Sequence, residues 1–336
     1  MSRTPESEWL GLGLGYRSNA EARSFLEERA DRDGSRHRIG TSVEGRPIEA
    51  YEWRLGGETV DSPCLLLLSL VHPMEWIGRE IHLALIEDLL DGRIGVAAGT
   101  RVVSVVDANP DGTARVESAL RSGRPAWVRG NARGIDLNRN FPAGFRTRPQ
   151  WVDFWPMWRP GPSPLSEPES QAILVARNLA RSHGSAGGAD RGSGLSISLH
   201  SFGRWVFYPP SSTRDITPLA REHERVISRA RSDLPGDGYR TRQLGRYAHW
   251  FRAHGTEIDF LADEWNEVGE QPDRELAYLV ELSWGGFCRW GVRRLLHPFF
   301  TFNPPHPERE IERVRPFLHR LIEEGIRGPR TNENSR

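Results

Sequence analysis

The strongest constraint on the fold is a buried-strand pattern that leads directly into a helix pattern. Residues 65–71 are apolar except for Ser69, which is typical of a strand covered on both faces of its sheet. In residues 75–90, apolar side chains recur at helical spacing. Three further strands are predicted, at residues 102–106, 195–199 and 277–282. Strands that alternate with helices predict one α/β domain.

The composition removes several classes of function. The chain has 336 residues with 45 basic and 45 acidic groups, and this balance argues against nucleic acid as a partner. All 45 basic residues are arginine, which excludes a Schiff-base lysine and a Walker-type lysine. The longest apolar run, residues 64–71, is far shorter than the ~20 residues of a membrane span. With no secretory leader recognisable and only two cysteines, we expect a cytoplasmic protein that binds no membrane.

Chemically active side chains follow the ends of the predicted strands, where α/β sheets form their ligand crevices. His72 and Glu75 come directly after the first strand, and His200 follows the strand at 195–199. Spaced three apart at a strand-to-helix turn, His72 and Glu75 can converge on one point, and His200 can supply a third ligand. Two histidines and one carboxylate leave a fourth tetrahedral position open, which is the pattern of catalytic zinc.

The order of motifs over residues 20–325 resembles the zinc carboxypeptidase family (M14 metallopeptidases) of the bacterial cytoplasmic type. The motifs are residues 39–48, His72-x-x-Glu75, 109–112, 127–131, 136–141, 166–169, His200-Ser201 and 279–282. The resemblance implies a mixed, mostly parallel, twisted sheet with helices on both faces. It also implies an N-terminal extension over residues 1–20, a catalytic domain over 21–325 and a flexible tail over 326–336.

The resemblance assigns a metal centre with one Zn²⁺ per chain. His72, Glu75 and His200 match the zinc ligands, and Asp136 matches the carboxylate that orients the first ligand histidine. Glu281 matches the general base. Zinc can lower the pKa of bound water to about 7, and a nearby carboxylate can then take the proton.

The resemblance also assigns the substrate contacts. Arg129 matches the guanidinium that stabilises the oxyanion, and Asn138 and Arg139 match the clamp on a terminal carboxylate. The implied substrate is therefore a peptide or peptide-like molecule with a free C-terminal carboxylate. Further substrate contacts are expected from Ser201, Phe251 and Ile258.

The chain departs from the family pattern in the substrate-closing loop. Phe251 stands where the family has a tyrosine, so a hydroxyl is lost there, and Tyr247 could compensate. The apolar residues Ile258 and Leu279 suggest a neutral or aromatic terminal side chain, whereas Arg204 in the pocket would favour an acidic one.

The sequence is compatible with three functions. The first is a metallocarboxypeptidase that hydrolyses the C-terminal bond. Residues 129–142 also resemble bacterial murein-peptide amidases, which act on γ-D-glutamyl-diaminopimelate bonds. The third is a catalytically silent carboxylate-binding module, against which the presence of both Glu281 and Arg129 counts, because binding alone needs neither.

Overall fold

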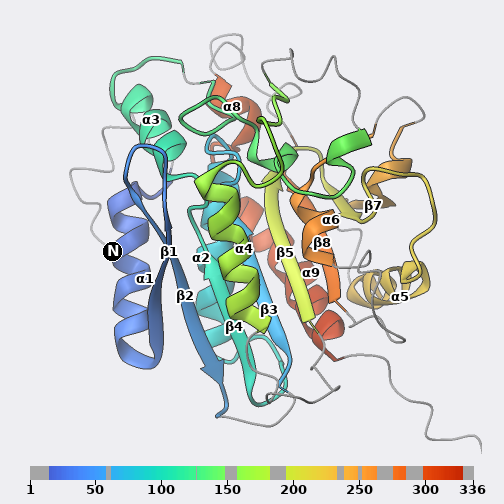
Figure 1. Ribbon diagram of the computed structural model, residues 1–336. Helices are drawn as coiled ribbons and strands as arrows, with labels where there is room; N and C mark the ends of the chain where they lie inside the picture. The colour runs from blue at the N-terminus through green and yellow to red at the C-terminus, as the bar shows by residue number, and fades with distance from the viewer. Residues whose placement is uncertain are drawn as a thin grey trace, which may run out of the picture.

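An eight-stranded sheet runs through the molecule (Figure 1) in the order β1-β2-β4-β3-β5-β8-β6-β7. The computed structural model describes residues 15–57, 62–125, 127–147, 157–181, 194–232, 238–248, 252–262, 275–284 and 298–327. The strands are β1 (Gly34–Thr41), β2 (Pro47–Leu55), β3 (Cys64–Ser69), β4 (Thr100–Val105), β5 (Gly194–Ser201), β6 (Trp205–Tyr208), β7 (Arg240–Gln243) and β8 (Glu275–Leu282).

The centre of the sheet is parallel, and antiparallel pairs flank it. Strands β4, β3, β5 and β8 run in the same direction, whereas β1, β2 and β4 pair antiparallel, as do β8 and β6. Leu65 to Leu68 are all buried, as a strand covered on both faces requires. The prediction of an α/β domain with a mixed, mostly parallel sheet is confirmed.

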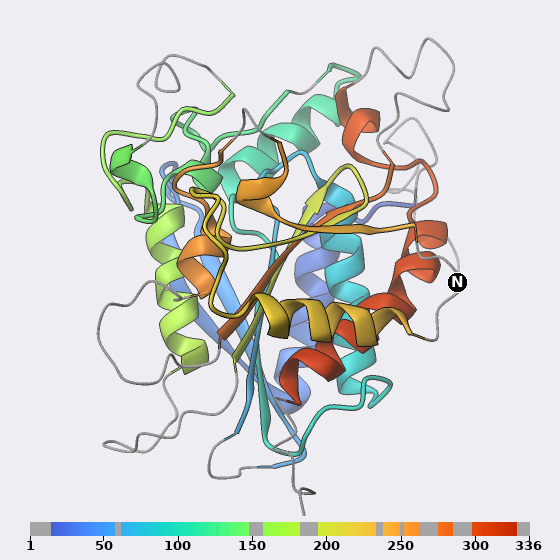
Figure 2. The same ribbon diagram turned by 90° about the vertical axis from the view of Figure 1, so that its right-hand side faces the viewer.

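Helices cover both faces of the sheet and enclose two separate apolar cores. On one face α4 packs on β1, β3 and β4, and α6 packs on β5 and β8. On the other face α2 and α9 pack on β3 and β5, as the turned view shows (Figure 2). The helices are α1 (Asn19–Asp33), α2 (Trp76–Leu90), α3 (Pro110–Arg121), α4 (Pro168–Arg181), α5 (Ala220–Arg231), α6 (Glu257–Ala262), α8 (Pro298–Phe302) and α9 (Pro307–Ile326). Among the described residues, none of the helices is long and apolar enough to cross a membrane.

The segment at residues 109–112 does more than turn the chain. The Asn109 side chain accepts a hydrogen bond from the Gly112 amide at 3.1 Å and so caps α3, a helix that the turn signal alone does not predict. Gly112 is required because a Cβ there would lie 2.4 Å from Pro73 Cγ. The cap therefore lies directly against the turn that carries His72.

The parallel centre determines where the site forms. The carboxyl ends of β3, β5 and β8 lie at the same edge of the sheet, and in register His200 is the partner of Glu281. After β3 the chain takes a positive φ of 54° at Leu70 and then delivers His72 to this edge. Side chains that are distant in sequence thus meet at one place.

Candidate metal and substrate site

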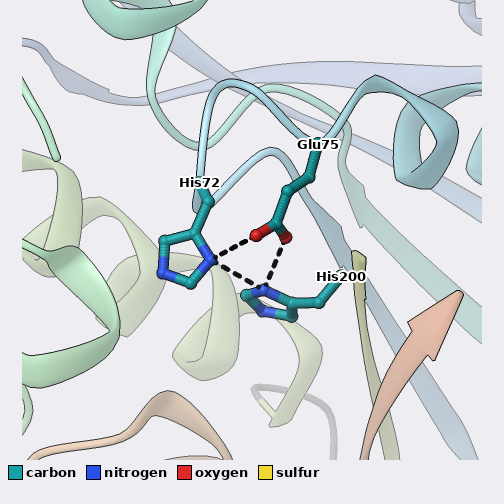
Figure 3. A group of neighbouring side chains, drawn as sticks. All are labelled: His72, Glu75 and His200. Atoms are coloured by element: carbon teal, nitrogen blue, oxygen red, sulfur yellow. Dashed lines mark hydrogen bonds and ion pairs between the residues drawn. The ribbon is translucent and has the colours of Figure 1, made fainter. Parts of the chain in front are cut away.

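Three side chains, two from the turn after β3 and one from the end of β5, converge at the edge of the sheet (Figure 3). His72 Nδ1 lies 2.9 Å from Glu75 Oε1, and His200 Nδ1 lies 3.0 Å from Glu75 Oε2. The two Nδ1 atoms are 3.1 Å apart. All three residues are buried, and their ligand atoms lie within 4.8 Å of one another, so they can hold one metal ion. The structure thus brings together the three residues that the sequence predicted as ligands.

The start of α2 explains why Glu75 is available as a ligand. Glu75 is the N-cap residue of α2, but its side chain makes no capping hydrogen bond. The Ser201 amide instead donates to Glu75 Oε2 at 3.1 Å, which ties the carboxylate to the end of β5. A Cβ at Gly78 would lie 2.8 Å from the Leu199 carbonyl oxygen, so glycine allows α2 to approach β5 closely.

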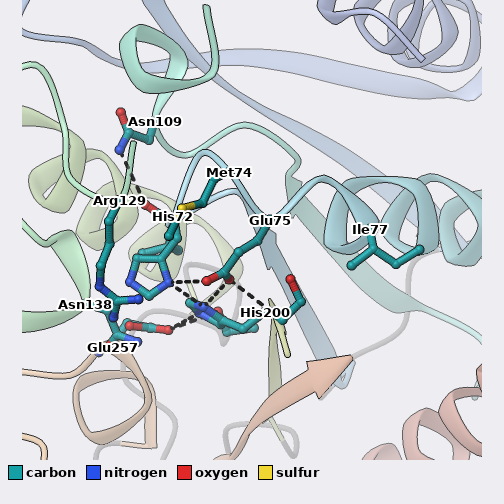
Figure 4. Close-up of polar contacts among 12 residues, drawn as sticks. His72, Met74, Glu75, Ile77, Asn109, Arg129, Asn138, His200 and Glu257 are labelled. Carbon is teal, nitrogen blue, oxygen red and sulfur yellow. Dashed lines mark hydrogen bonds and ion pairs between the residues drawn. The ribbon is translucent and has the colours of Figure 1, made fainter. Parts of the chain in front are cut away.

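Each ligand histidine contacts a different carboxylate through Nε2, and Figure 4 shows the contact between His200 and Glu257. His72 Nε2 lies 3.0 Å from Asp136 Oδ1, as the sequence predicted. His200 Nε2 lies 2.6 Å from Glu257 Oε1, a contact that sequence reasoning missed. A carboxylate on Nε2 favours the tautomer that leaves the Nδ1 lone pair free for a metal. Both imidazoles are therefore oriented for the same ion.

The charges of the site favour a cation at its centre. Although burial opposes ionisation of Glu75, His72 and His200 lower its pKa to about 2. Burial likewise opposes ionisation of Asp136, but Arg129 and His72 hold its pKa well below the usual range. Burial disfavours a charged His200, yet Glu257 and Glu75 outweigh it and raise the imidazole pKa well above its ordinary value.

A divalent cation also fits the balance of buried charge. Four carboxylates surround the described site and only two guanidinium groups offset them, so a charge of +2 would neutralise the excess when both histidines are neutral. The carboxylates belong to Glu75, Asp136, Glu257 and Glu281, and the guanidinium groups to Arg129 and Arg139. The donor set and the charge balance agree with zinc.

A cavity of about 270 Å³ opens beside His72 and Glu75. Its polar part includes Glu281, Arg129 and Arg139. Burial and the nearby Glu75 carboxylate raise the pKa of Glu281 to about 7. Glu281 Oε2 is shielded from solvent and has no hydrogen-bond partner among the described residues. The apolar part of the cavity lining includes Trp205, Phe207, Leu244, Ala253 and Leu279.

The segment after α3 delivers the two arginines to the cavity. Arg129 Nε donates to Asp136 Oδ2 at 2.9 Å. Arg139 is 8 % exposed, and its Nη1 donates to the Asn138 carbonyl at 2.5 Å. Burial lowers the pKa of the Arg139 guanidinium, and no carboxylate of the described chain lies within ion-pair distance of it. Arg139 is thus a buried cation that faces the cavity without a counterion.

The three other residues that were expected to contact the substrate differ in where they lie. Ser201 lines the cavity, and its buried Oγ has no partner among the residues described. Ile258 is buried in the apolar cluster behind the cavity and is not part of its lining, which Leu279 joins instead. Phe251 lies outside the described residues.

Tyr247 and Arg204, the two residues that the sequence left undecided, differ in position. Tyr247 lines the cavity, with its ring edge-on to Trp205 and Phe207. Arg204 is not part of the lining, because its guanidinium pairs with Glu310 at 3.3 Å and packs over Trp284. The structure therefore contradicts an acid-binding role of Arg204 in this cavity.

Comparison with known proteins agrees with this geometry. A family model described as zinc carboxypeptidase matches residues 23–312. Carboxypeptidase A5 of Macaca fascicularis is 28 % identical over 213 residues, which cover 60 % of this chain and 45 % of that protein. Carboxypeptidase E of Caenorhabditis elegans is 35 % identical over 120 residues, which cover 32 % of this chain and 25 % of that protein. The matches thus span about half or less of these relatives' lengths.

Solved structures show the same fold. The crystal structure of carboxypeptidase A from Helicoverpa armigera has a TM-score of 0.69 and 19 % sequence identity, and the match covers 97 % of this chain and 77 % of that one. The crystal structure of thrombin-activatable fibrinolysis inhibitor has a TM-score of 0.61 and 18 % identity, over 98 % of this chain and 78 % of the other.

Proposed function

Since this chain belongs to the zinc carboxypeptidase family, whose cofactor is Zn²⁺, we propose that it is a hydrolase that removes the C-terminal residue of a peptide or peptide-like substrate. One observation carries the proposal: the cavity lined by His72 and Glu75 of the His-Glu-His group also holds Glu281, whose Oε2 has no hydrogen-bond partner among the described residues, and Arg139, which has no counterion among them. These are the parts that hydrolysis of a carboxylate-terminated amide requires.

Glu281 is proposed as the general base. Zinc bound by His72, Glu75 and His200 would supply a Lewis acid that polarises the scissile carbonyl and acidifies water. The shielded Oε2 of Glu281 can accept a proton from water and later give it to the leaving amine. A carboxyl with a raised pKa suits both directions of proton transfer at neutral pH.

Arg129 is proposed to stabilise the negative charge that develops on the carbonyl oxygen. Its Nε is already bonded to Asp136, which leaves the terminal nitrogens of the same guanidinium for the substrate. The Asp136 carboxylate contacts both Arg129 and His72, so one side chain orients two catalytic groups. A fixed donor at a developing oxyanion contributes ~3–4 kcal/mol to the lowering of the barrier.

Arg139 and Asn138 are proposed as the clamp on the substrate's terminal carboxylate. A buried guanidinium without a counterion gains most from a bidentate carboxylate. Because the clamp lines one cavity of about 270 Å³ together with the metal ligands His72 and Glu75, little substrate can extend beyond the scissile bond. This confinement supports removal of one residue at a time.

The apolar part of the cavity supports a preference for an apolar or aromatic terminal side chain. Trp205 and Phe207 stack at a ring-centroid distance of 5.3 Å and, with Leu279, present a water-poor surface. A charged side chain placed there would lose its hydration without a described partner.

The test compares two forms of one substrate. A blocked dipeptide with a C-terminal phenylalanine is offered as the free acid and as the amide. Hydrolysis of the free acid should be much faster than hydrolysis of the amide. Equal kcat/KM values would contradict removal of a terminal residue and favour an endo-acting amidase.

The murein-peptide amidase stays the second candidate, because it would use the same metal chemistry. A γ-D-glutamyl-diaminopimelate peptide in the same assay separates the two, since only the amidase cleaves it preferentially. The proposed cytoplasmic location, and the proposed lack of nucleic-acid and membrane partners, are tested by cell fractionation and by nucleic-acid and vesicle binding assays.

A further inference from the structure

We propose that Glu257 is a positioning residue that sets the metal affinity of the site and couples the metal to the substrate clamp. The inference rests on the proposed function only for its zinc site. Glu257 is the first residue of α6, which packs on β5 and β8, and it is 0 % exposed. Its position behind His200 corresponds to that of Asp136 behind His72.

The contacts of Glu257 fix His200 from the side away from the metal position. Glu257 Oε1 lies 2.6 Å from His200 Nε2, and the Ser198 hydroxyl donates to the same oxygen at 3.2 Å. The short contact holds the ring plane and its tautomer, so that Nδ1 faces Glu75 and His72. Without a fixed tautomer, His200 would exchange between forms of which only one can ligate.

Glu257 differs from Asp136 in its own surroundings. Asp136 shares its charge with Arg129, whose Nε is 2.9 Å from Oδ2. Glu257 has no guanidinium partner among the described residues, and its second oxygen, Oε2, is buried without a hydrogen bond. Arg139 lies near enough to interact with this charge but forms no ion pair with Glu257, so the direct contact of the carboxylate is with His200. That charge makes the imidazole a stronger ligand for a divalent ion.

A continuous series of hydrogen bonds connects the two ligand histidines through Asn138 of the clamp. The Glu257 amide donates to Asn138 Oδ1 at 3.2 Å. The Asn138 amide donates to Asp136 Oδ1 at 3.0 Å, and Asp136 holds His72. His72 and His200 then meet at the metal position. Glu257 thus contacts a ligand histidine with its side chain and Asn138, the residue next to Arg139, with its backbone amide.

The experiment measures zinc affinity directly. Glu257→Gln keeps the shape and removes the charge, and zinc Kd is measured by competition with a chromophoric chelator. The expected result is a Kd about 10- to 100-fold weaker than in the wild type. The matched control is Glu169→Gln, since Glu169 is equally buried but its side chain accepts hydrogen bonds from Asn131 and the Val43 amide rather than contacting a metal ligand. Its zinc Kd should stay within about twofold of the wild type.

A second readout follows the imidazole itself. In the Co²⁺-substituted wild type, ¹H NMR should show two shifted, slowly exchanging imidazole N–H signals, from His72 and His200. In Glu257→Gln one signal should move or exchange faster while the other stays. The wild-type spectrum is a test by itself, also if Glu257→Gln does not fold. If one of the two imidazole N–H signals of the wild type exchanges fast with solvent, the proposal is overturned.

The possible failures are distinguishable. If the wild type binds no zinc, the proposed function fails at its metal site. If the wild type binds zinc and Glu257→Gln binds it equally well, the role of Glu257 fails and the proposed function stands. A weaker Kd in Glu257→Gln with an unchanged Kd in Glu169→Gln supports the inference.

Discussion

Replacement of Arg139 by alanine should selectively impair substrates that end in a free carboxylate. Arg139 is a cavity-facing cation that, within the described chain, donates a side-chain hydrogen bond to the Asn138 carbonyl and has no counterion, so a substrate carboxylate would be its first. A hydrogen bond to a charged group contributes about 1.5–3 kcal/mol. At about 1.4 kcal/mol for each factor of ten, kcat/KM should fall by about 10- to 150-fold on the free acid.

The assay compares kcat/KM on the free acid and on the C-terminal amide for the wild type and Arg139→Ala. The slow rate on the amide should hardly change. Arg139→Lys should restore little, because an ammonium group cannot reproduce the planar fork of a guanidinium. The matched control is Arg133→Ala, since Arg133 lies in the same loop but pairs with Glu167 and is not part of the cavity lining. An equal loss on acid and amide would refute the clamp and indicate general damage to the site.

Three further predictions concern the base, its protonation and the helix beside the site. Glu281→Gln should keep zinc, by elemental analysis, and lose about 10²- to 10⁴-fold in kcat, because an amide cannot accept a proton from water. Zinc retained with nearly full activity would require another base. The pKa of Glu281 is raised from 4.5 to about 7 by burial and Glu75, and a bound divalent cation would lower it. The base works when deprotonated, so kcat/KM should fall as the pH drops through a pKa between these two values. A profile flat down to pH 4.5 would exclude Glu281 as the titrating base. Asn109→Ala should lower the free energy of unfolding by about 1 kcal/mol, because α3 loses its cap. An unchanged denaturation midpoint would show that the cap contributes nothing.

The elements of the parallel core could be predicted because their signals are local. The run at residues 65–68 is apolar without interruption, and the spacing of apolar residues in α2 is helical, so each segment carries its own evidence. The helix α3 was missed because Asn109 and Pro110 favour a turn and a helix start equally. Only the packing of Gly112 against Pro73 distinguishes the two.

The candidate ligands could be predicted because His72 and Glu75 are neighbours in the chain and His200 ends a recognisable strand. Glu257 could not, because nothing local distinguishes it from an ordinary residue at the start of a helix. Its importance arises from the packing of α6 beside β5, which brings its carboxylate to His200. For the same reason sequence alone left Arg204 in doubt, since its pairing with Glu310 in α9 is a long-range contact.

One zinc ion, held by His72, Glu75 and His200, is proposed to be required for hydrolysis. The direct measurement titrates zinc into chelator-treated protein while it follows hydrolysis of a blocked dipeptide with a free carboxylate. Activity should vanish in the metal-free protein, return in proportion to added zinc and saturate at one equivalent per chain. No such recovery is expected in His72→Ala. Full activity without metal, or equal recovery in His72→Ala, would contradict this zinc site.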